Sequence, residues 1–170
     1  MKTRAYFKKA IYPLLGLILF TFFISACKKD TVANNTGNYE MTFNANGTQI
    51  KYNTDNAVVA TFSQTGEQYV GIFSGYDANS NMGLSVYDNK QISESDYTGF
   101  TASGMATVGA LIGYQDDSGT LYSQAGNDVD IKISSITSDS VSGTFSGTLT
   151  ATGKPNMVIT EGKFTLKRLN

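Results

Sequence analysis

The sequence contains no histidine and only one cysteine, Cys27. The absence of histidine excludes Ser-His-Asp and Cys-His nucleophiles and every metal site built on imidazole ligands. A single cysteine cannot form a disulfide within the chain, so stability must come from a packed core. No glycine-rich phosphate loop lies between a strand and a helix. We therefore predict no catalytic residue, no metal ligand and no cofactor, and we expect a protein that is not an enzyme.

The N-terminal region has the order of a secretory signal. Residues 1–9 contain four lysines or arginines and no acid, and residues 10–26 are uncharged, mostly apolar and end in small residues. The apolar run of 17 residues is shorter than the roughly 20 that a transmembrane helix needs, and Pro13 and Gly16 weaken it as a helix. We therefore predict a cleaved signal peptide over residues 1–26, in preference to a permanent spanning helix.

The end of this run is Ile24-Ser25-Ala26-Cys27, which resembles a bacterial lipobox. The resemblance implies that the Cys27 thiol is joined to lipid and that the signal is cleaved between Ala26 and Cys27. Small residues before the cysteine give a peptidase access to the bond, and the thiol is the nucleophile toward the lipid donor. A buried apolar thiol is the alternative, but the polar Lys28 and Lys29 follow directly. The expected partner of this site is a membrane.

Residues 27–38 are predicted to be the acylated cysteine and a flexible tether, because the segment is polar and has no periodicity. Cleavage after residue 26 of 170 would leave 144 residues, the size of one domain. That part holds all 14 acids but only 9 of the 13 basic residues, a formal charge of −5. An acidic chain without a basic stripe excludes nucleic acid as a partner.

Residues 39–170 alternate with a period of two and are interrupted by Gly, Asn, Asp and Ser, which predicts an all-β domain. We expect a single antiparallel β-sandwich or flattened barrel of about 8–10 strands. Asn46-Gly47 predicts a tight hairpin that pairs Met41 with Tyr52, Phe43 with Ile50 and Ala45 with Thr48. The further predicted strands cover residues 57–63, 68–76, 82–87, 106–114, 120–123, 128–134, 141–151 and 156–166.

The sequence also predicts three local features of this domain. Residues 57–63, 68–76 and 106–114 are apolar in both phases, which predicts strands covered on both faces. Residues 88–105 are expected to form a long polar connection, with Ile92, Tyr97 and Phe100 as apolar plugs. The alternation changes phase between Ile159 and Phe164, which predicts a β-bulge, and Gly162 is the natural place for its positive φ.

The candidate sites for chemistry are few. The carboxylate pairs are Glu94 and Asp96, Asp116 and Asp117, and Asp128 and Asp130. The last pair shares one strand face and could supply an acid and a base, although a solvated strand face is the simpler interpretation. Residues 77–81 have the D-x-N-x-N spacing of a calcium loop, with Asp88 at the twelfth position, but Met82 occupies the place of the usual glycine.

Five tyrosines lie near predicted strand ends or loops, where exposed rings could stack against a sugar: Tyr76, Tyr87, Tyr97, Tyr114 and Tyr122. The alternative is that they are ordinary half-buried strand tyrosines, as β propensity predicts.

The whole mature chain resembles a family of small Bacteroidota lipoproteins with a domain of unknown function. The resemblance rests on the lipobox, the tether, the opening MTFNANGTQIKY and the closing VSGTFSGTL and ITEGKFTL. It implies export and a lipid anchor in the cell envelope, at the outer membrane, with the periplasmic or surface side left open. It implies no catalytic residue. We expect a non-enzymatic binding or structural module with a glycan or an envelope protein as partner, and a carboxylate-based glycan hydrolase as the alternative.

Overall fold

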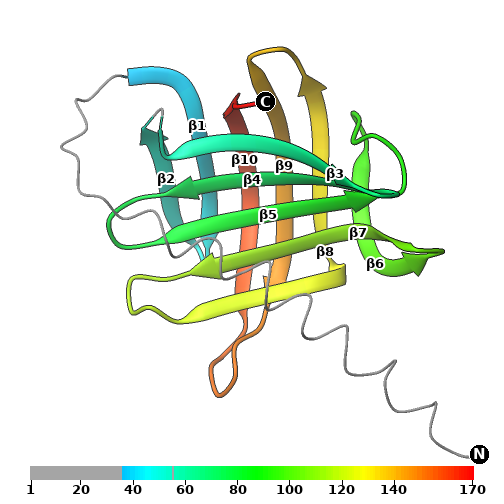
Figure 1. The fold of residues 1–170 in the computed structure, drawn as a ribbon. Coiled ribbons are helices and arrows are strands. Elements are labelled where there is room, and N and C mark those ends of the chain that lie inside the picture. Colours follow the sequence, from blue (N-terminus) through cyan, green and yellow to red (C-terminus); the bar gives the residue numbers. More distant parts are fainter. Residues whose placement is uncertain (1–35, 55) are drawn as a thin grey trace, which may run out of the picture. The chain divides into compact units, whose positions relative to one another are not determined.

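The computed structural model describes residues 36–54 and 56–170, which form an all-β unit (Figure 1). The predicted signal peptide, Ile24 to Cys27 and most of the tether lie outside the described residues. β1 begins at Thr36, so the last residues of the predicted tether, 36–38, belong to a strand. The compact unit that contains every strand and the core runs from Asn34 to Asn170, and we expect it to fold by itself.

The described residues form ten strands. In chain order they are β1 (Thr36–Ala45), β2 (Thr48–Thr54), β3 (Val58–Thr65), β4 (Gln68–Tyr76), β5 (Asn81–Asp88), β6 (Asp96–Ser103), β7 (Ala106–Gln115), β8 (Leu121–Ile136), β9 (Ser140–Leu149) and β10 (Met157–Arg168). In residues 36–54 and 56–170 no helix is long and apolar enough to cross a membrane.

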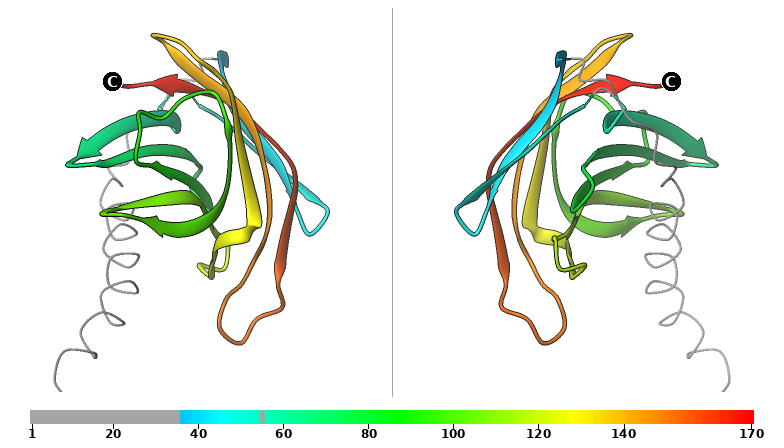
Figure 2. Two further views of the ribbon diagram at one scale, coloured as in Figure 1. Left: turned by 90° about the vertical axis from the view of Figure 1, so that its right-hand side faces the viewer. Right: turned by 90° about the vertical axis from the view of Figure 1, so that its left-hand side faces the viewer.

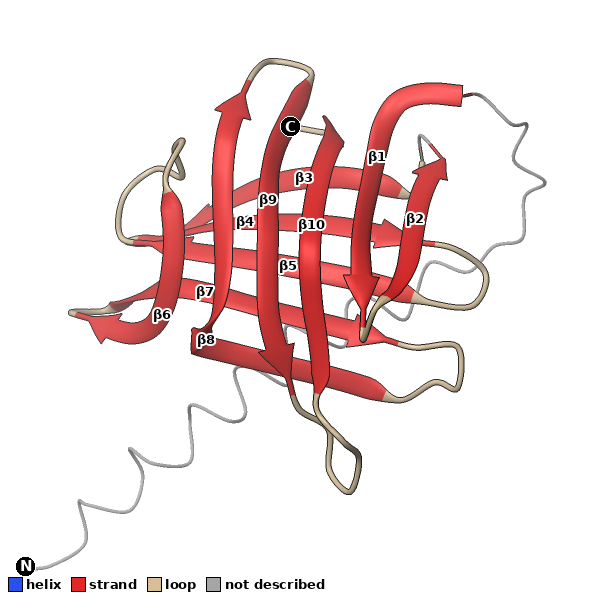
Figure 3. Cartoon of the chain, turned by 180° about the vertical axis from the view of Figure 1, so that it is seen from behind, coloured by secondary structure: helices blue, strands red, loops and turns tan. Residues whose placement is uncertain are grey.

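The strands close into a ring. β3, β4, β5 and β7 are neighbours in that order, and β7 pairs with β8, β8 with β9, β9 with β10, and β10 with β3 (Figure 3). The β1–β2 hairpin extends the sheet from β10, and β6 pairs with both β7 and β8. Among the described strands, only the short pairing of β10 with β3 is parallel. The predicted antiparallel sandwich or flattened barrel is therefore confirmed.

The ring is flattened into two layers whose strands cross each other at a steep angle, an orthogonal packing (Figures 1 and 2). One layer contains β3, β4, β5, β7 and the start of β8, and the other contains β1, β2, β9, β10 and the rest of β8. Four phenylalanines fill the space between the layers: Phe43, Phe73, Phe145 and Phe164. The rings of Phe73 and Phe164 stack with centroids 5.4 Å apart. The interior is therefore a packed core.

β8 turns the corner between the layers, which corrects two predictions. The strands predicted over residues 120–123 and 128–134 are one continuous strand that bends at Gly126, where φ is +103°. The second correction is β6, which lies within residues 88–105, predicted to be a connection. β6 pairs first with β8 and, after Gly99, with β7. Most side chains of β6 are exposed, so its sequence lacks the clear alternation of a half-buried strand.

The plugs predicted in that segment are confirmed in part. Ile92 and Tyr97 are buried, but Phe100 is 42% exposed, and its ring packs edge-on against Tyr87 with centroids 5.5 Å apart. The prediction that β3, β4 and β7 are covered on both faces is also wrong in the described part of the chain. Their inner faces pack on the core, whereas outward residues such as Ile72 and Leu111 remain half-buried.

The predicted Asn46-Gly47 hairpin and the predicted β-bulge are both confirmed. Asn46 and Gly47 have φ of 47° and 84°, and the pairs Met41–Tyr52, Phe43–Ile50 and Ala45–Thr48 form. The β9–β10 hairpin contains the predicted bulge, since the register shifts between Ile159 and Gly162. The positive φ of 54° is at Glu161, however, and not at Gly162. A side chain at Gly162 is excluded for another reason: its Cβ would overlap the Phe145 carbonyl and ring.

Candidate functional site

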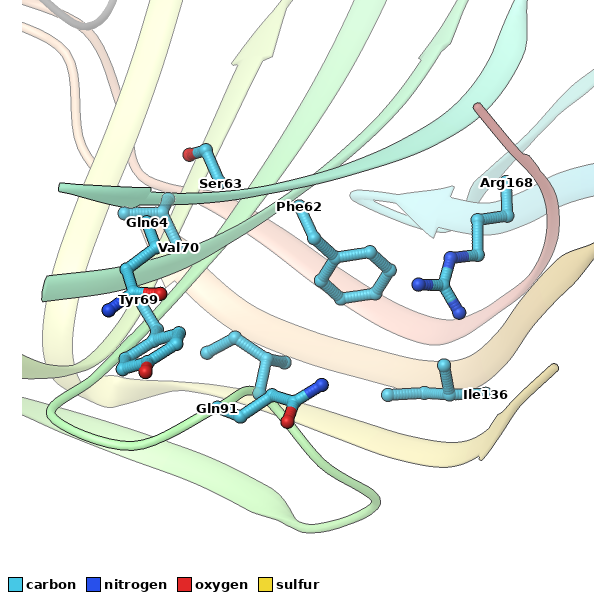
Figure 4. Close-up of a pocket in the computed structure, with 9 residues that line it drawn as sticks. Phe62, Ser63, Gln64, Tyr69, Val70, Gln91, Ile136 and Arg168 are labelled. Carbon is cyan, nitrogen blue, oxygen red and sulfur yellow. The ribbon is translucent and has the colours of Figure 1, made fainter. Parts of the chain in front are cut away.

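A pocket of about 400 Å³ lies at the seam where the ring closes (Figure 4). It is lined by Phe62, Ser63, Gln64, Tyr69, Val70, Gln91, Ile92, Ile136 and Arg168. These residues come from β3, β4, the β5–β6 connection, the end of β8 and the end of β10. Aromatic and aliphatic walls with a few polar groups are typical of small-molecule sites, and the mouth of a β-barrel is a common place for one.

The pocket exists because β10 ends before β3 does. β10 pairs with β3 only through Lys167 and Arg168, opposite Val59 and Ala60. The Asn170 side chain then accepts from the Phe62 N–H at 2.9 Å and donates to the Phe62 carbonyl at 2.7 Å. β3 continues beyond this cap, and the space next to its last residues is the pocket.

Arg168 is the only charged residue in the lining. Its guanidinium carbon lies 5.1 Å from the centre of the Phe62 ring, a cation–π geometry, and Nη1 donates to the Thr137 carbonyl at 2.8 Å. Nε donates to the main-chain oxygen of Asn170, the last residue of the sequence. Within residues 36–54 and 56–170 the ion pairs between side chains are Lys51–Glu40 and Lys132–Asp96, so Arg168 pairs with no Asp or Glu side chain there.

The opposite wall is held in place by hydrogen bonds. The Ser93 N–H donates to the Tyr97 hydroxyl, which donates back to the Ser93 carbonyl, both at 3.0 Å. Glu94 Oε1 accepts from the Ile136 N–H at 3.1 Å, which joins the connection to β8. Ile92, from the same connection, is only 7% exposed. These bonds fix Gln91 and Ile92 in a preformed wall.

A second recess, of about 370 Å³, lies on the charged outer face of the other layer. It is lined by Asp96, Asp130, Lys132, Thr144, Phe145, Ser146, Glu161, Gly162 and Lys163. Asp96 is paired with Lys132 at 3.3 Å, and Glu161 accepts from Asn44 Nδ2 at 2.9 Å. Asp130 and Glu161 are on β8 and β10 with β9 between them, which places their backbones roughly 10 Å apart.

The predicted carboxylate pairs do not form an enclosed acid–base site. Asp128 and Asp130 are exposed on the same face of β8, as predicted, but only Asp130 lines the recess. Glu94 contacts the backbone of Ile136, away from Asp96 and its lysine. Asp116 closes a turn by accepting from Ser118 and Thr120. Burial acts to raise the pKa of Asp116, but these bonds and Lys154 outweigh it, so the pKa is lowered.

Residues 77–81, which have the spacing of a calcium loop, form a turn. Asp77 Oδ1 accepts from the N–H groups of Asn79 and Ser80 at 2.8 Å, as turn aspartates do. Asp88 is at the far end of β5, roughly 20 Å from this turn, so it cannot complete a shared ion site. In the part of the chain that the structure describes, no cluster of three or more acidic, histidine or cysteine residues could hold a metal ion.

The five tyrosines do not form an exposed platform, and the alternative, that they are ordinary strand tyrosines, agrees better with the structure. Tyr87, Tyr97, Tyr114 and Tyr122 are all buried, and only Tyr76 is exposed, at 43%. The aromatic residues that do line a pocket are Phe62 and Tyr69, which the sequence analysis did not single out. Their positions at the ends of two adjacent strands were a usable signal, but their meeting with Arg168 depends on ring closure.

We compared the chain with protein-family models, with curated proteins and with solved structures, and none matched. The function must therefore be inferred from the geometry of the pocket, together with the export pattern of the first residues.

Proposed function

We propose that this chain is a lipid-anchored envelope protein whose β domain is a non-enzymatic binding module, with its ligand held in the seam pocket. The pocket carries the proposal, because it combines an open mouth, preformed walls and both aromatic and aliphatic lining. Its position at the end of a closed ring leaves the core intact when a ligand enters.

The chemistry of the lining supports binding in preference to catalysis. The nine side chains include one hydroxyl, two amides, one phenol and one guanidinium, and none is a carboxylate. The Ser63 hydroxyl has no general base among these residues, so no activated nucleophile results. Arg168 and the two glutamines can orient a polar group of a ligand, which is what a binding site needs.

The proposal of a lipid anchor is based on the sequence of the N-terminal residues. Ile24-Ser25-Ala26-Cys27 follows a charged and then apolar segment, and we propose that lipid on Cys27 attaches the domain to the envelope, at the outer membrane. The acidic character of the mature chain is compatible with this location and gives no basis for nucleic-acid binding.

The alternative is a glycan hydrolase in the charged recess. Three acids line it, and inverting glycosidases use two carboxylates that face each other across such a recess. The recess lies on an open sheet face, where a catalytic acid would not be shielded from water, so we rank this function second.

These functions can be separated with the soluble form, residues 30–170. We would screen oligosaccharides and envelope extracts by isoleucine-methyl NMR, with Ile92 and Ile136 as reporters for the pocket and Ile72 as a control on the outer face. Shifts confined to Ile92 and Ile136, without release of product, are expected. Glycan cleavage that Asp130→Asn abolishes and Asp128→Asn preserves would establish the hydrolase instead.

A further inference from the structure

We infer that the seam pocket selects an anionic amphiphile, with an acidic head group on Arg168 and an apolar chain along Phe62, Tyr69, Ile92 and Ile136. This inference rests on the proposed binding function and adds the chemical class of the ligand. It follows from the charge, the free donors and the apolar surface of one cavity.

The charge of the pocket is opposite to that of the domain. Residues 27–170 contain 14 acidic and 9 basic residues, yet the pocket is lined by one cation and no acid. Arg168 is half-buried, and no acidic side chain of the described residues pairs with it, so a negative group of a ligand would stabilise this partly desolvated cation. A cationic ligand would be repelled from this wall, whereas an anion would complete it.

The Arg168 guanidinium has N–H donors that make no hydrogen bond within the described residues. Arginine carries five N–H donors, and the bonds to Thr137 and Asn170 use one on Nη1 and the one on Nε. Nη2 has no acceptor among the described residues. In Figure 4 the guanidinium extends from β10 toward the Phe62 ring and the space above Ile136. The remaining donors can reach an acidic head group, for which charge-assisted hydrogen bonds are the strongest interaction available.

The other walls match an apolar chain. Phe62 and Tyr69 are neighbouring inward-facing residues on β3 and β4, and Gly71 leaves room for the Phe62 ring because a Cβ there would crowd it at 3.3 Å. Ile92 and Ile136 form the opposite wall. The bonds that hold the β5–β6 connection keep this apolar surface open in the absence of a ligand, so little reorganisation is required.

The test uses three probes of matched length: octanoate, octanamide and octylammonium. Binding to residues 30–170 is followed by the methyl signals of Ile92 and Ile136, with Ile72 as the control. We expect octanoate to bind about tenfold more tightly than octanamide, because a charge-assisted bond replaces a neutral one, and octylammonium to bind most weakly.

Two variants identify the cation. Arg168→Gln should reduce octanoate binding about tenfold, to the level of octanamide, and Arg168→Lys should retain the preference for octanoate. Lys167→Gln removes the same charge from the preceding, exposed position of β10 and should leave all three affinities unchanged. Urea unfolding of each variant checks that the fold is intact.

The outcomes distinguish the two proposals. Equal binding of the three probes, or a preference that Arg168→Gln does not remove, overturns the anionic ligand class while the binding module stands. Absence of shifts at both Ile92 and Ile136 with every probe overturns the inference, and a negative screen with envelope extracts would also overturn the binding function.

Discussion

The carbonyl group of Gly99 occupies the position that a Cβ atom on Gly109 would require. Gly109 has φ of +140° and pairs with Phe100, directly after Gly99 in β6. Gly99 in turn pairs with Gly126, the bend of β8. The three glycines therefore form the corner at which the two layers are joined, and close backbone contact there depends on the absence of side chains.

Gly109→Ala should lower the free energy of unfolding by about 3 kcal/mol or more, because its methyl group meets backbone atoms that cannot move aside. Gly104→Ala is the matched control. Gly104 also has positive φ, +66°, but open space around its Cβ position, so the cost should be only about 1 kcal/mol. Urea unfolding measures both, and equal costs would show that the corner is not tightly packed.

The bulge in β10 predicts opposite effects for two adjacent substitutions. Glu161→Gly should stabilise the domain by about 0.5 kcal/mol, since glycine relieves the positive φ and the lost bond from Asn44 is exposed. Gly162→Ala should destabilise it by about 2–4 kcal/mol, because the new methyl group overlaps Phe145. Thermal melts decide the sign, and a stabilising Gly162→Ala would contradict the observed register.

The domain should lose stability at alkaline pH. Burial raises the pKa of the Tyr52 hydroxyl far above its ordinary value of 10.0; Tyr114 and Asp77 add to this, and the bond to Ser80 opposes it. Burial likewise raises the pKa values of Tyr87 and Tyr114. In the unfolded chain tyrosines ionise near pH 10, whereas the three buried tyrosines of the folded domain stay protonated to higher pH. Their contribution to the free energy of unfolding is therefore complete below pH 10 and declines above it.

The Tyr52 hydroxyl alone should lower the free energy of unfolding by about 1.4 kcal/mol per pH unit above pH 10, and Tyr87 and Tyr114 should add to this decline, measured by urea unfolding from about pH 9 to about pH 11. Tyr52→Phe should make the decline shallower. Ser80→Ala, which removes the 2.8 Å contact with the Tyr52 hydroxyl but keeps the tyrosine, should preserve it. An unchanged slope in Tyr52→Phe would mean that this hydroxyl is not protected in the folded state.

Cys27→Ser should abolish incorporation of labelled palmitate and release or mislocalise the protein, because the thiol is the proposed lipid attachment site. The β domain of the full-length variant should unfold at the same urea concentration as in the wild type, since its core lies within Asn34–Asn170. Fractionation of cells that express wild type and variant provides the comparison. Retention of Cys27→Ser in the membrane, with no label in the wild type, would refute the anchor.

Local sequence was sufficient for most of the strands. The Asn46-Gly47 hairpin and its register follow from two turn residues and the alternation on either side of them. Val129, Ile131 and Ile133 are buried and Asp128, Asp130 and Lys132 exposed, as their alternation predicts. β6 was missed because most of its side chains face water, and the continuity of β8 was missed because Gly126 resembles a loop residue.

By itself, the sequence determined that the domain is all-β and that it has no internal disulfide. Because the chain contains no histidine, the sequence also excluded catalytic and metal sites that depend on an imidazole. It also predicts an exported, lipid-anchored chain. Only the tertiary structure decided how the ring closes, which glycines form its corner, and that Phe62 and Arg168 meet in a pocket. Alternation and turns depend on neighbours a few residues apart, whereas the contact between Phe62 and Asn170 spans 108 residues.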